Sequence, residues 1–174
     1  MKSRTESLIG QASSDDIRIA LNYKDAAIIL FKSDAYQDGI TLPALFLIRQ
    51  FLELGLKYNI KKLNNVSLCD ELVANLTKEH DLNKLHKAFI SHYKSAKSVK
   101  NISGLKEKKF LDALKLLTEK ISLLDVKSQG FRYSRNTNDH KIIALEETFN
   151  LANVFKLLED SGDFLASIDD LFCL

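Results

Sequence analysis

A chain of 174 residues that contains one proline and six glycines has few of the residues that form turns. Proline and glycine interrupt helices, so their scarcity allows long continuous helical segments. A chain made only of strands normally carries more turn residues than this one does. The scarcity of these two residues therefore favours an all-α protein.

Apolar residues also recur at helical spacing. The clearest segment lies between residues 110 and 124, where alternating steps of four and three place one stripe on a single helix face. Two other segments, one from Leu82 and one from Ile142, repeat the pattern. The stripes are Leu82, Leu85, Phe89, Ile90 and Tyr93; Phe110, Leu114, Leu117, Ile121 and Leu124; and Ile142, Leu145, Phe149, Ala152, Phe155 and Leu158. Five or six such helices predict a single helical bundle.

Local signals predict where these helices begin and end. Residues 13–16 look like a capped helix start, with that helix running to about Lys32. A break at 38–39 precedes a second helix, which residues 41–43 open with proline in the first turn and which runs to about Lys62. Ser67 is expected to cap a short helix to about Leu76, and Asp81 to cap the next one. Residues 161–162 are expected to separate the last long helix from an apolar tail.

No linker divides the chain, which predicts one domain over residues 15–174. The polar residues 1–14 that precede it are expected to form a flexible N-terminus. The N-terminal residues show no apolar signal-peptide core, and charged residues interrupt the apolar stretch 42–60. Cys69 and Cys173 are isolated, without the spacing of a zinc site, as suits a reducing compartment. We therefore expect a cytoplasmic protein with no membrane span.

Charge is unevenly distributed although the net charge is only +2. Lysines dominate from Lys84 to Lys127, and acidic residues dominate after Lys141. A basic middle could bind an anionic partner. The alternative is that both regions are ordinary solvated helix faces.

The second predicted helix carries a row of charged residues. Arg49, Glu53 and Lys57 are four residues apart, so they share one face of a helix that is otherwise mostly apolar. A charged row on a central helix is expected to face a groove or a polar seam. The alternative is an ion-pair ladder that holds helices in register.

Two further sets of residues could carry chemistry. His80 precedes the predicted cap Asp81 and is either a catalytic or substrate-binding residue or a cap or packing residue. The irregular segment 131–140 combines arginines, a tyrosine and a histidine, which suit phosphate contact, base stacking and proton transfer. The alternative for this segment is a packed tyrosine, solvated arginines and a helix cap at 138–139. His86 and His92 lie six residues apart and do not share a helix face, so no metal pair is predicted.

These stretches, in this order, resemble the HEPN superfamily of prokaryotic toxin–antitoxin and antiviral defence systems. Residues 45–57 are similar to the HEPN core helix, His80-Asp81-Leu82 to an "HDL" element, and Arg132-Tyr133 to an "RY" element. The resemblance covers roughly residues 20–160. It implies a bundle with an antiparallel core pair of helices, and a substrate-binding set of Arg49, Glu53, Lys57, His80, Arg132 and Tyr133.

The resemblance also implies an activity. Nuclease members carry Arg-Asn-x-x-x-His, and Arg135, Asn136 and His140 fit that pattern. By the resemblance Arg135 would hold the scissile phosphate of RNA, His140 would transfer protons and Asn136 would steady the pair. Such enzymes are homodimers that use no metal or other cofactor. The protein partner would be an antitoxin or a defence component.

Three interpretations remain open at this point. The first is a metal-independent endoribonuclease. The second is a non-catalytic HEPN-like module that binds a nucleotide, RNA or a protein. It is favoured by the Arg132-Tyr133 form, which resembles non-nucleolytic members, and by Lys141-Ile142, where nuclease members have a small residue and an aromatic one. The third is an unrelated helical interaction protein.

Overall fold

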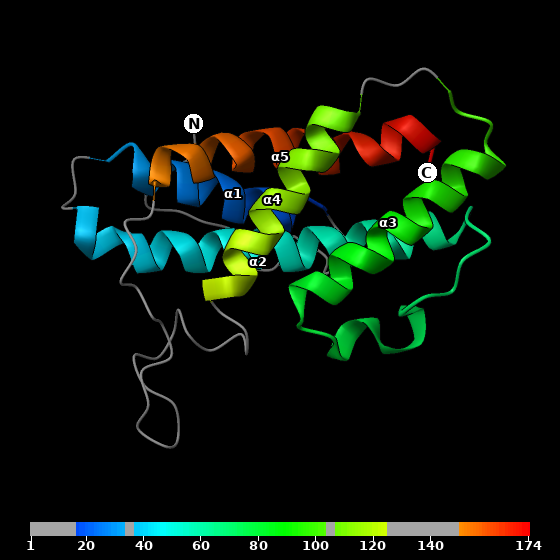
Figure 1. The fold of residues 1–174 in the computed structure, drawn as a ribbon, viewed down its shortest axis with the longest axis horizontal. Coiled ribbons are helices and arrows are strands. Elements are labelled where there is room, and N and C mark those ends of the chain that lie inside the picture. Colours follow the sequence, from blue (N-terminus) through cyan, green and yellow to red (C-terminus); the bar gives the residue numbers. More distant parts are fainter. Residues whose placement is uncertain (1–16, 34–36, 104–106, 125–149) are drawn as a thin grey trace, which may run out of the picture.

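The computed structural model describes residues 17–33, 37–103, 107–124 and 150–174. Its helices are α1 (Ile17–Phe31), α2 (Gln37–Asn64), the 3-10 helix η1 (Val73–Lys78), α3 (Leu82–Val99), α4 (Lys108–Leu124) and α5 (Leu151–Phe172). No strand occurs among these residues. The predicted all-α bundle is confirmed (Figure 1). The predicted flexible N-terminus, 1–14, lies outside the described residues.

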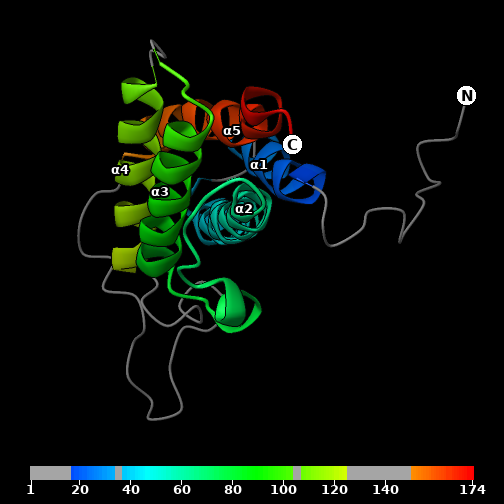
Figure 2. The ribbon, with the colours of Figure 1, turned by 90° about the vertical axis from the view of Figure 1, so that its right-hand side faces the viewer.

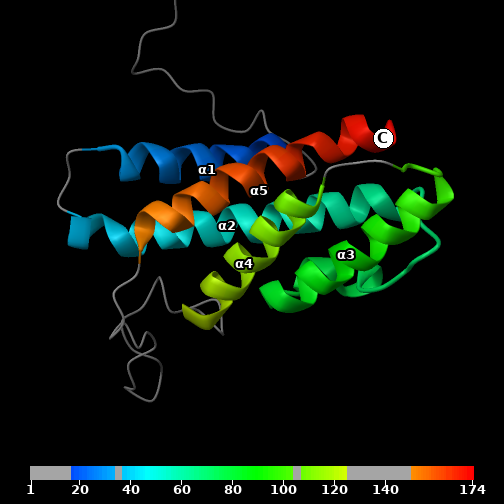
Figure 3. The ribbon, with the colours of Figure 1, turned by 45° about the horizontal axis from the view of Figure 1, so that its top comes forward.

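The long helix α2 occupies the centre of the bundle. Viewed from the end, α1 and α5 lie against one side of it, α3 and α4 against another, and η1 beneath it (Figure 2). The helices α1 and α2 lie side by side and run in opposite directions (Figures 1 and 3). They form the predicted antiparallel pair.

Apolar residues around much of the circumference of α2 explain its central position. Ala44, Leu45, Ile48, Phe51, Leu52, Leu56, Ile60 and Leu63 are buried. A helix that is apolar on most sides is stable only when other elements cover it. By length and composition alone, Gly39–Asn64 would also suffice to cross a membrane, a test that the core helix of a soluble protein passes too.

The start of α2 differs from the prediction. The helix begins at Gln37, so the expected break at 38–39 is wrong, and Pro43 lies inside the helix rather than in its first turn. Glycine can adopt helical backbone angles, and at Gly39 no described residue beyond its chain neighbours and the adjacent helix backbone lies within 4 Å of the position that a Cβ would occupy. Pro43 removes only the hydrogen bond to the carbonyl four residues earlier, which leaves the first turn in place.

The predicted stop near the C-terminus is also wrong, because α5 continues through Ser161 and Gly162 to Phe172. Both residues are buried. The side chain of Lys24 in α1 crosses α5 at Gly162, where a Cβ would lie 2.4 Å from the lysine Cδ. These residues therefore allow close packing of two helices. Asn150 caps α5, and the predicted stretch 142–149 lies outside the described residues.

Ser67 does not cap a helix. Residues between α2 and η1 form turns, and η1 begins only at Val73. The Ser67 hydroxyl contacts Nδ1 of His92 at 2.8 Å, and Nε2 of His92 contacts the carbonyl of Glu71 at 3.0 Å. A fully buried imidazole needs a partner at each nitrogen, and Ser67 supplies one of them.

The predictions for α3 and α4 are confirmed. Asp81 caps α3 by accepting hydrogen bonds from the amides of Asn83 and Lys84. Most of the predicted stripe residues are buried, and Ile90, Phe110 and Leu124 pack against them. Tyr93 of α3 contacts the rings of Phe164 and Phe172, which joins α3 to α5.

Candidate functional site

The charged row of α2 forms a chain of ion pairs. Oε2 of Glu53 lies 2.7 Å from Nη1 of Arg49, and Oε1 lies 2.9 Å from Nζ of Lys57. The side chain of Arg49 is 2% exposed and that of Glu53 is 10% exposed. Such a pair is more tightly constrained than the exposed ion pairs common on helix surfaces.

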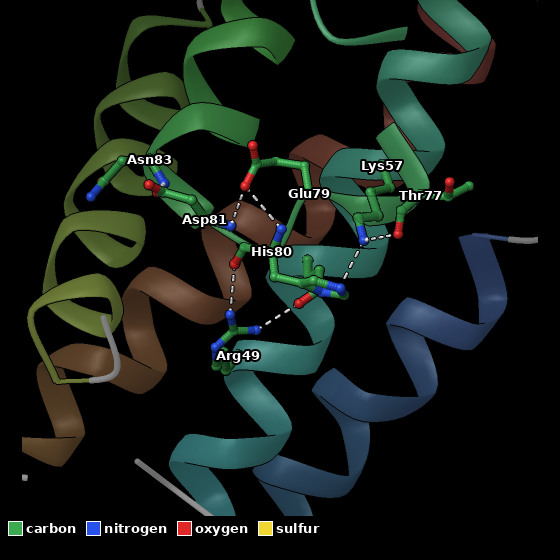
Figure 4. A network of polar contacts seen from close by, with 8 residues as sticks. Arg49, Lys57, Thr77, Glu79, His80, Asp81 and Asn83 are labelled. Carbon is green, nitrogen blue, oxygen red and sulfur yellow. Dashed lines mark hydrogen bonds and ion pairs between the residues drawn. The ribbon is translucent and has the colours of Figure 1, made fainter. Parts of the chain in front are cut away.

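These residues also bind the connection between η1 and α3, so the row faces a polar seam. Nη2 of Arg49 donates to the carbonyl of His80 at 2.7 Å. Nδ1 of His80 lies 2.8 Å from Oε1 of Glu53, and Nζ of Lys57 lies 3.4 Å from the carbonyl of Thr77 (Figure 4). The structure thus brings together four of the predicted site residues. We call Arg49, Glu53, Lys57 and His80 the polar network.

Two carboxylates fix the backbone on the other side of His80. Oε1 of Glu79 accepts hydrogen bonds from the amides of His80, at 3.0 Å, and Asp81, at 2.9 Å (Figure 4). Asp81 in turn caps α3. The backbone from 79 to 81 is therefore held by side chains of α2 and by its own carboxylates. Glu79 was not among the predicted site residues, although an acidic residue just before a helix is a sequence signal for this role.

The surroundings favour the charged form of both glutamates. Burial by itself would raise the pKa of Glu53, but hydrogen bonds from Arg49, Lys57 and His80 and the charge of Lys57 outweigh it, so the pKa lies below 4.5. The two backbone amides and Lys84 likewise lower the pKa of Glu79. The polar network is built around an ionised Glu53.

The polar network presents one side chain to solvent. The side chain of His80 is 59% exposed, whereas those of Arg49, Glu53 and Lys57 are largely covered. The contacts of Arg49 and Glu53 fit the alternative in which these charges form ion pairs that hold the helices in register. His80 is the member of the polar network that a ligand in solvent could reach.

The other predicted site residues, Arg132, Tyr133, Arg135, Asn136 and His140, lie outside the described residues. Within the described part of the chain, no group of three or more His, Cys, Asp or Glu side chains could hold a metal ion. Cys69 and Cys173 are both free thiols.

Comparison with protein-family models, with curated proteins and with solved structures gave no match to this chain. The HEPN resemblance therefore rests on the short motifs described above and stays a prediction.

Proposed function

We propose that this protein is a HEPN-like module of a defence or toxin–antitoxin system that acts on RNA in the cytoplasm. One observation supports the proposal above others. The similar segments 45–57 and 80–82 meet in one polar network, through a hydrogen bond between residues 27 positions apart in the chain.

The proposed reaction is RNA cleavage by Arg135, Asn136 and His140. His140 takes the proton of a 2′-hydroxyl, whose oxygen attacks the adjacent phosphorus. The bond from phosphorus to the 5′-oxygen breaks, and that oxygen leaves with a proton from solvent or from the second histidine of a dimer. Arg135 holds the charged phosphate through two hydrogen bonds. The products are a 2′,3′-cyclic phosphate and a 5′-hydroxyl.

The test is cleavage of RNA by the purified protein in the presence of a chelator. We expect the wild type to produce 2′,3′-cyclic phosphate ends, and His140→Ala and Arg135→Ala each to lose about 100-fold or more in rate. Lys141→Ala, next to the motif, serves as the matched control. Cutting that survives in His140→Ala would refute the proposed chemistry.

A second candidate is a binding module without catalysis. It is favoured by the Arg132-Tyr133 form of the sequence and not by Arg49 and Glu53, which are buried and bonded within the protein. This candidate predicts RNA or nucleotide binding without turnover. Binding would then fall in Arg132→Ala and stay unchanged in His140→Ala. Arg132→Ala is a better probe than a change at Arg49, because loss of a buried arginine also destabilises the fold.

A further inference from the structure

One face of α3 carries an uninterrupted polar row that begins at the polar network. His80 stands just before the helix, and from Lys84 onward steps of three, four, three and four keep the side chains on one side of α3. The row consists of His80, Lys84, Lys87, Ser91, Lys94 and Ser98. The opposite side of α3 is buried in the core through Leu85, Phe89 and Tyr93.

The lysines of this row are available to an anionic partner. The side chains of Lys84 and Lys87 are 63% and 78% exposed, and their nearest carboxylates, on Glu79 and Glu71, lie 3.5 and 3.7 Å away. Exposed pairs of this kind are weak and are easily exchanged. Lys94 is exposed and forms no ion pair with any residue that the structure describes.

We infer that this row is a docking surface for the backbone of single-stranded RNA, with the lysines on phosphates and the ring of His80 against a base. This inference rests on the proposed function, because that function supplies RNA as the ligand. From Lys84 to Lys94 the row is about 15 Å long at 1.5 Å per residue, the length of roughly four stacked nucleotides.

The composition of the row distinguishes RNA from an acidic protein. Protein interfaces bury an apolar or aromatic centre, and the row contains no apolar side chain. Lysine and serine are common phosphate-binding residues. An exposed imidazole can stack on a base only where that base is unpaired, which selects a single strand over a duplex.

The experiment measures binding of a labelled 2′-O-methyl oligouridine by fluorescence anisotropy between about 50 and 200 mM salt. This probe lacks the 2′-hydroxyl nucleophile, so binding is read whether or not the protein cleaves RNA. With three phosphate contacts the logarithm of the association constant should fall against the logarithm of salt with a slope of roughly −2. The double variant Lys87→Ala/Lys94→Ala should flatten the slope to roughly −0.7 and weaken binding on the order of 10-fold.

The matched control is Lys32→Ala/Lys156→Ala, which removes the same charge from exposed lysines at α1 and α5 and should leave slope and affinity unchanged. For the ring, His80→Ala should weaken binding by about 5-fold or more at every salt concentration, and His80→Phe should restore it, because phenylalanine stacks but cannot bond Glu53.

Each other result has a definite meaning. Equal losses in the two double variants would overturn the docking surface and leave the proposed function standing. No binding of the probe by the wild type would also overturn it, and the cleavage assay would then decide the proposed function alone. Stronger binding of polyglutamate than of the probe, lost in Lys87→Ala/Lys94→Ala, would assign the row to an acidic protein instead.

Discussion

Replacing Glu53 with glutamine keeps the shape of the side chain and removes the negative charge that Arg49 and Lys57 share. Arg49, at 2% exposed, would keep its charge in the core and lose the ionised carboxylate that now lies 2.7 Å away. The amide group of glutamine would also turn hydrogen atoms toward at least one of the cationic groups that now donate to Glu53.

Breaking a buried ion pair from one side costs about 3–5 kcal/mol, because the remaining charge stays desolvated. For a chain of this length we therefore expect Glu53→Gln to lower the melting temperature by about 6–20 °C. The matched control is Glu119→Gln in α4, which breaks the exposed i,i+4 pair with Lys115. That change should cost no more than about 0.5 kcal/mol.

Urea denaturation followed by far-ultraviolet circular dichroism measures both variants. A third variant, Arg49→Met/Glu53→Leu, removes both buried charges and should be more stable than Glu53→Gln, since apolar residues can replace a buried pair at little cost. A loss below about 1 kcal/mol in Glu53→Gln would refute the view that this pair stabilises the fold. A double variant less stable than the single one would refute the reasoning that the unpaired charge of Arg49 causes the loss.

Two further predictions concern pH and packing. Acid should lower stability in two stages, because the folded protein resists protonation of both groups: below pH 6.5 for His86, whose pKa burial lowers, and below pH 4.5 for Glu53. Denaturation at stepped pH checks this, and His86→Gln should remove the upper stage alone. Gly55→Val should lower the free energy of unfolding by about 1–3 kcal/mol, because a Cβ there would already lie 3.1 Å from Leu165. Gly39→Ala, with open space around the new Cβ, should raise it by about 0.5–1 kcal/mol. Equal effects of the two glycine changes would contradict the packing described for α2.

Patterns within a single helix were predictable from the sequence. The stripes of α3 and α4 and the cap at Asp81 follow from spacing and residue type, and the structure confirms them. The alignment of Arg49, Glu53 and Lys57 likewise follows from four-residue steps. Each of these features depends on neighbours within about two turns of the same helix.

Features that depend on a second element were not predictable. Ser67 looks like a cap, but it bonds His92, which lies 25 residues away. Ser161 and Gly162 look like a helix stop, but the side chain of Lys24 needs the space there. The bond from Arg49 to the carbonyl of His80 involves a backbone atom, for which no residue type in the sequence is a signal.

The contacts separate two roles that the charge pattern of the sequence leaves mixed. The charges of α2 are buried and fix the start of α3, because Arg49 holds the carbonyl of His80 and Glu53 holds its ring. Lys84, Lys87 and Lys94 of α3 face solvent and contribute little to that scaffold. A ligand along α3 would therefore meet a surface that is already ordered, which lowers the entropy lost on binding. It follows that Lys87→Ala/Lys94→Ala should weaken RNA binding while the free energy of unfolding stays within about 1 kcal/mol of the wild type. The main effect of Glu53→Gln should instead be a lower free energy of unfolding. Measuring both quantities on both variants tests whether stability and binding are carried by different helices.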